Sequence, residues 1–118
     1  LKDAGYYFNC HAEVDLDRIC EHVIAYVEFT LNDNSLAQRR RFEASVEEIP
    51  EFMDCLRLSG DTDYISFTCC TNLAELNRIC DELSGLEELG IQKIVIRPVL
   101  ERPKFYLGYP IAKLKWLD

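Results

Sequence analysis

The sequence lacks most of the features that mark enzymes, membrane proteins or nucleic-acid binders. It has no His-x-x-x-His, Gly-x-Ser-x-Gly or phosphate-loop pattern, each of which supplies a specific catalytic or phosphate-binding group. No apolar run approaches the roughly 20 residues that a membrane helix needs. Positive charge is scarce too, because 13 Lys and Arg stand against 21 Asp and Glu, a net charge of -8. Such a charge repels a phosphate backbone, so these residues lack the net positive charge that is typical of a DNA or RNA binder.

No Cys-x-x-Cys pair occurs among the six cysteines, and their spacing is too irregular for a disulfide scaffold. A reducing cytoplasm fits this pattern best. Cys10, Cys69 and Cys80 each stand beside apolar residues, where a free thiol acts as a small buried apolar group. We therefore expect structural cysteines rather than metal ligands or nucleophiles.

Histidine is equally sparse, since the chain has only His11 and His22. Asp15, Asp17 and Glu21 form an acidic turn next to His22, which can recruit a metal or remain a solvated connection. The solvated connection is the better interpretation. We expect no catalytic residue, no metal site and no cofactor, and hence a protein that is not an enzyme.

What the sequence does contain is regular hydrophobic periodicity, in a chain of one domain's length. Alternating apolar residues predict strands over 6–14 and 23–31. Ser35 with Gln38 forms a capping-box pattern, and Pro50 prevents continuation, so a helix is predicted over 35–48. Two strands over 52–59 and 64–70, joined by a short loop, predict an antiparallel hairpin.

A second helix and a last strand complete the pattern. Asn72 with Glu75 caps a helix that Ser84-Gly85 ends, and a strand follows at about 91–101. After the first strand, the order β-α-β-β-α-β predicts an α+β, ferredoxin-like sandwich with both helices on one face of the sheet. The other face, with Ile24, Tyr26 and Val95 or Val99, has no third layer to cover it. We therefore expect a sheet-to-sheet dimer, an assembly like an α/β barrel, and a tail over 102–118 that packs on the sheet or on a partner.

The order of these elements, and the residues that end them, resemble those of the C-terminal effector-binding domain of the Lrp/AsnC family of prokaryotic transcription regulators. Residues 1–6 look like the end of that family's winged helix-turn-helix, and residues 11–15 look like its hinge strand. Residues 48–52 match a helix that ends at proline before the hairpin. The most specific match is the turn over 58–64, Leu-Ser-Gly-Asp-Thr-Asp-Tyr, similar to the turn where family members hold an amino acid between neighbouring dimers.

This turn also suits an amino acid on chemical grounds. Gly60 can adopt positive φ and leave adjacent N–H groups free for a carboxylate, while Asp61 or Asp63 can take the ammonium. An ordinary hairpin loop, whose aspartates bond their own backbone, is the alternative. The resemblance adds Ser84, at the end of the second helix of a neighbouring subunit, as a residue that closes the site. The predicted effector-binding residues are Ser59, Gly60, Asp61, Thr62, Asp63, Tyr64 and Ser84.

The resemblance also implies a domain organisation and a mechanism. Residues 1–5 would be the remnant of an upstream helix-turn-helix domain, and residues 6–118 the effector-binding and oligomerisation domain. An amino acid or similar metabolite would change how homodimers assemble into tetramers or octamers, and DNA would be bound only through the missing N-terminal domain. The alternatives are a free-standing sensor, for which residues 1–5 would be needless, and an enzyme related to siroheme decarboxylases or small oxygenases.

Overall fold

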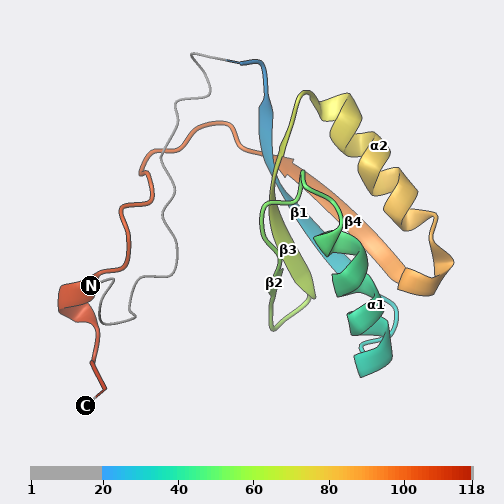
Figure 1. The fold of residues 1–118 in the computed structure, drawn as a ribbon, viewed down its shortest axis with the longest axis horizontal. Helices are drawn as coiled ribbons and strands as arrows, with labels where there is room; N and C mark the ends of the chain where they lie inside the picture. The colour runs from blue at the N-terminus through green and yellow to red at the C-terminus, as the bar shows by residue number, and fades with distance from the viewer. Residues whose placement is uncertain (1–19, 118) are drawn as a thin grey trace.

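A computed structural model describes residues 20–117 as a four-stranded antiparallel sheet with two helices on one face (Figure 1). The predicted strand over 6–14, the upstream remnant and the acidic turn up to Asp17 lie outside the described residues. The elements are β1 (Val23–Leu31), α1 (Leu36–Glu47), β2 (Leu56–Arg57), β3 (Tyr64–Cys70), α2 (Leu73–Ser84) and β4 (Ile91–Pro98), with short 3-10 turns η2 (Glu87–Leu89) and η3 (Ile111–Lys113).

The strands are ordered β2-β3-β1-β4, which confirms the predicted split β-α-β arrangement. β1 lies in the centre and pairs with β3 on one side, where Tyr26 faces Phe67, and with β4 on the other, where Tyr26 faces Arg97. Alternate residues of β1 are buried under the helices, as period-2 patterning requires. The core consists of Phe29, Phe42, Leu76, Leu89 and their apolar neighbours.

Both helices begin and end close to the predicted positions. The Ser35 hydroxyl accepts the Gln38 N–H and the Asn72 side chain accepts the Glu75 N–H, so both N-caps are confirmed. The reciprocal half of the capping box is absent, because the Gln38 side chain donates to the carbonyl of Glu88 instead. That bond ties α1 to η2 and so orders the connection between α2 and β4.

The prediction of a strand over 52–59 was wrong in extent. Only Leu56–Arg57 pairs as a strand, with a single bridge from Phe52 to Thr68 further back. Between them, Asp54 replaces the regular ladder: its carboxylate accepts the Phe67 N–H and its carbonyl accepts the Ser66 hydroxyl. A polar side chain that competes for backbone partners therefore interrupts this edge strand.

The last strand and the tail differ from the prediction in part, and packing of the tail on a partner stays a prediction. β4 ends at Pro98 rather than at 101, since proline offers no N–H to a ladder, although the Val99 N–H still bonds the Ile24 carbonyl. Beyond it the chain leaves the sheet on the side away from the helices instead of packing along its own sheet (Figure 1). Residues 113–116, where Lys113 and Lys115 alternate with Leu114 and Trp116, form no strand, and η3 is the sole regular turn in the described part of the tail.

Candidate functional site

The turn between β2 and β3 has the backbone geometry that its sequence predicts. Gly60 has a φ of 108°, in the region that L-residues other than glycine rarely adopt. The turn is closed below by a bond from the Leu58 N–H to the Asp63 carbonyl. Within residues 20–117, the N–H groups of residues 59–62 donate to no backbone or side-chain acceptor. Free N–H donors and a positive φ at a glycine are the features from which anion-binding turns are built, so the turn suits an anion such as a carboxylate.

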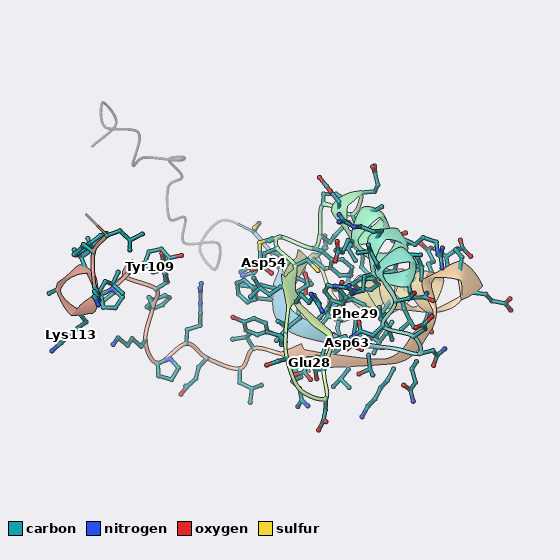
Figure 2. The ribbon with its side chains drawn as sticks, turned by 90° about the horizontal axis from the view of Figure 1, so that it is seen from below. Glu28, Phe29, Asp54, Asp63, Tyr109 and Lys113 are labelled. Carbon is teal, nitrogen blue, oxygen red and sulfur yellow. The ribbon has the colours of Figure 1, made fainter. Side chains whose placement is uncertain are left out.

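The two aspartates of the turn have different roles. The Asp63 carboxylate accepts the Leu31 N–H at 2.7 Å, and the Asp63 N–H donates to the Phe29 carbonyl. Asp63 therefore anchors the turn to the end of β1 (Figure 2). Asp61 is exposed and makes no hydrogen bond or ion pair within the described residues. Of the two carboxylates, Asp61 is the one available to an ammonium group.

Thr62 connects the turn to the open face of the sheet. Its hydroxyl donates to Glu28 Oε1 at 3.2 Å, while Arg97 Nε donates to Glu28 Oε2 at 2.7 Å. Glu28 lies in the middle of β1, on the face that the helices leave uncovered, and its side chain is only 22% exposed. Sequence reasoning missed Glu28 and Arg97, because only the strand register reveals that they meet.

Tyr64 points into the core rather than into a pocket. Its ring stacks at 4.6 Å from that of Phe42, and its hydroxyl donates to Glu43 of α1 at 2.5 Å. Burial and the Glu43 carboxylate together raise the pKa of Tyr64 far above its ordinary value, although Arg39 and Arg57 lower it in part. The tyrosine therefore stays protonated and fixes β3 against α1, directly behind the turn.

Arg57 is a third residue that the sequence reasoning missed. It lies opposite Tyr64 in the β2–β3 pair and is exposed, with no ion pair within the described residues. Its guanidinium adds positive charge near Tyr64, whose pKa it lowers in part, two residues before Ser59. The signal was available in the sequence, since Arg57 immediately precedes Leu58 and the turn.

Ser84 does not approach the turn in its own chain. It is the exposed last residue of α2, which leads into β4 at one edge of the sheet, whereas the turn lies at the β2 edge (Figure 1). A site that contains both therefore requires a second copy of the chain, as the prediction specified. The role of all seven predicted residues in binding an effector stays a prediction.

The cysteines confirm the structural interpretation only in part. Cys70 and Cys80 are buried, but Cys20 and Cys55 are exposed, because their neighbours lie in irregular segments rather than in the expected alternation. Burial raises the pKa of Cys80 to about 11, which keeps it a thiol at neutral pH. All five cysteines of residues 20–117 are free. The same residues hold no cluster of three or more potential metal ligands.

Comparison with known proteins identifies the class to which this fold and turn belong. The sequence pattern of the Lrp/AsnC ligand binding domain matches residues 24–107. The chain therefore belongs to this family, which confirms the resemblance. A proline dehydrogenase transcriptional activator of Rhodobacter capsulatus is 36% identical over 68 residues, 57% of this chain and 44% of the relative. The transcriptional regulatory protein DoeX of Halomonas elongata is 24% identical over 106 residues, 87% of this chain and 66% of the relative.

Solved structures agree on the fold. A transcriptional regulator of Neisseria meningitidis in complex with L-methionine has a TM-score of 0.79 at 24% identity, covering 93% of this chain and 70% of that one. An AsnC family regulator of Agrobacterium tumefaciens has a TM-score of 0.78 at 21% identity, covering 94% and 71%. The chain is thus a ligand-binding domain of the Lrp/AsnC family, and it spans less than two thirds of the length of either curated relative above.

Proposed function

We propose that this domain senses an amino acid or a similar small metabolite on behalf of a transcription regulator. The observation that carries the proposal is the turn over 59–63, in which the N–H groups of residues 59–62 are unpaired around Gly60 and the Asp61 carboxylate is free. An α-amino acid presents the complementary pair of charges, a carboxylate and an ammonium. The relative solved with L-methionine supports this ligand class.

The site is completed in the assembly. The open sheet face joins two copies, and further contacts between dimers bring Ser84 of a neighbouring subunit to the turn. Tetramers or octamers that assemble from dimers in this way respond to a ligand that has different affinities for two assemblies. DNA is bound through a helix-turn-helix domain upstream of residue 6, so ligand-dependent assembly respaces the DNA-binding domains.

A non-catalytic role is part of this proposal. The names of the two curated relatives describe transcription regulators. None of the helices within residues 20–117 is long and apolar enough to cross a membrane, and a cytoplasmic location is consistent with a regulator. Two of the predicted site residues, Asp63 and Tyr64, are hydrogen-bonded to other parts of the fold rather than free for a chemical step.

The test is a thermal-shift screen of the twenty amino acids with parallel sizing by light scattering. A ligand that binds only the folded state adds about 2.7 kcal/mol at 100 times its Kd, which raises Tm by roughly 10 °C in a domain of this size. We expect one or a few amino acids to raise Tm and to change the assembly state. Asp61→Asn should abolish the shift, whereas Asp81→Asn, an exposed aspartate on α2, should leave it intact. An unchanged affinity in the Asp61 variant would refute the site.

A further inference from the structure

The C-terminal arm, defined as residues 101–118, makes no hydrogen bond or ion pair to the body of the domain, as far as residues 101–117 are described. Every residue of 101–117 is exposed. Its interactions are internal: Arg102 lies 5.0 Å over the ring of Phe105, and Tyr106 packs edge-on against Tyr109 at 6.4 Å. Figure 2 shows Tyr109 and Lys113 well away from the sheet, on the side opposite the helices.

An arm of this composition is unusual for a free surface. Its exposed large apolar residues are Phe105, Tyr106, Leu107, Tyr109, Ile111, Leu114, Trp116 and Leu117. Exposed apolar groupings of this size mark interaction sites in soluble proteins. Burying the four aromatic rings alone would remove roughly 400 Å² or more from water, about half of the ~800 Å² that each partner contributes to a standard interface.

The open face of the sheet offers a matching surface. It presents Ile24, Tyr26, Ile65, Phe67, Val95 and Val99, the residues whose strand register places them opposite the helices. A hollow of about 980 Å³ opens between this face and the arm: Tyr26, Phe67, Asp54 and Val99 line it from the body, and residues 101–110 of the arm form the rest of its wall. The arm forms one wall of this hollow and leaves its interior open, so a segment of another molecule has room to enter.

Charge favours a second copy of this chain as the source of that segment. The arm carries four basic and two acidic residues, a net charge of +2, whereas residues 1–100 carry nine basic and nineteen acidic ones, a net charge of -10. Each arm is therefore attracted to the acidic body of another copy, where Asp54 lies at the hollow. Two acidic bodies brought face to face also repel each other, and basic arms between them offset that repulsion.

We propose that the arms are exchanged: the arm of each copy crosses to the open sheet face of the other and fills the hollow there. An isologous pair allows this, because the same arm and the same hollow occur on both copies. The inference rests on the sheet-to-sheet dimer of the proposed function and adds that the arm supplies a large share of its affinity.

Trp116 is the only tryptophan, and its position in the arm makes it a direct reporter. The full chain is diluted through the monomer–dimer transition while emission wavelength and acrylamide quenching are followed, with sedimentation equilibrium on the same samples. We expect Trp116 emission to move to shorter wavelength, and quenching to fall, in step with the dimer fraction. Ending the chain after Leu100 should weaken the dimer at least tenfold, and Tyr106→Ser with Tyr109→Ser should do so in part.

The controls separate the arm from the sheet face. Leu36→Ser removes an exposed leucine from α1 and should leave the dimer Kd unchanged, whereas Phe67→Ser should weaken the dimer with or without the arm. If ending the chain after Leu100 leaves Kd unchanged while Phe67→Ser disrupts the dimer, arm exchange is wrong and the sheet-face dimer stands. Protection of Trp116 that does not depend on concentration would mean docking on its own chain. Protection that appears only with duplex DNA would mean a nucleic-acid partner; either result overturns the proposal.

Discussion

At the scale of single residues, Asp63 shows how a turn predicted to bind a ligand can use one of its carboxylates for folding. Its side chain holds the Leu31 N–H and its backbone bonds Phe29 and Leu58, so it joins three segments of the sheet. Asp61, two positions earlier, makes no hydrogen bond or ion pair within the described residues. The sequence alone does not show which aspartate serves folding and which is free for a ligand, because that depends on which of them faces the end of β1.

We predict that Asp63→Ala lowers the free energy of unfolding by about 1–3 kcal/mol, since a hydrogen bond to a charged acceptor is lost and the Leu31 N–H is left without a partner. Asp61→Ala should change stability by less than about 0.5 kcal/mol, as is usual for exposed positions. Urea denaturation of the two variants measures the difference. Equal destabilisation by both substitutions would contradict these assigned roles.

Two glycines with positive φ allow strain and steric conflict to be separated. At Gly60 an added Cβ meets no atom within 4 Å, so Gly60→Ala carries only the backbone penalty of about 1–2 kcal/mol. At Gly90, with φ of 61°, an added Cβ would lie 2.5 Å from Gln38 Nε2. Gly90→Ala should therefore cost more, because Gln38 must also release the Glu88 carbonyl. Denaturation midpoints test this order, and the reverse order would show that Gln38 moves aside freely.

At the scale of elements, local signals located the helices well and the edge strand poorly. Ser35 and Asn72 mark helix starts because a side-chain oxygen satisfies an N–H close by in sequence. The strand prediction over 52–59 failed because pairing there is decided by Asp54, whose partners Ser66 and Phe67 lie on β3, twelve and thirteen residues away. Periodicity identifies which residues suit a strand, but not whether a polar side chain will replace the ladder.

We predict that Asn72→Ala lowers stability by about 1 kcal/mol through loss of the cap on the Glu75 N–H. Asn72→Asp should retain the cap, because a carboxylate accepts the same bond and also favours a helix N-terminus. Thermal denaturation followed by circular dichroism compares the three proteins. If Asn72→Asp lost as much stability as Asn72→Ala, the amide group rather than the cap would be the important feature.

At the scale of the whole molecule, the uncovered sheet face and the turn could be predicted from the sequence. The side-chain hydrogen bonds that connect these two surfaces could not. The uncovered sheet face follows from counting layers, and the turn with Gly60 follows from its residues. The path from Thr62 through Glu28 to Arg97 depends on a register between β1 and β4, residues 69 apart in sequence. That path connects the proposed effector turn to the proposed dimer face, two surfaces that sequence reasoning treated separately.

The buried thiols give the whole fold a dependence on alkaline pH whose sign can be derived. Burial raises the pKa of Cys80 from 9.0 to about 11, with smaller contributions from Cys70 and Asp81. Between these two values the folded state holds a proton that the unfolded state has lost, so the free energy of unfolding falls as pH rises. This contribution is fully present below pH 9 and disappears as pH passes about 11.

We therefore predict that the midpoint of urea denaturation falls between pH 9 and 11, and that Cys80→Ala makes the fall shallower even though it lowers stability at neutral pH through the lost side chain. Cys20→Ala, at an exposed position, is the matched control and should leave the slope unchanged. Cys70 and Tyr64, whose pKa values are also raised by burial, should preserve part of the slope in either variant. A slope that Cys80→Ala leaves unaltered would mean that this thiol ionises equally easily in both states, and hence that the core around α2 opens before the fold is lost.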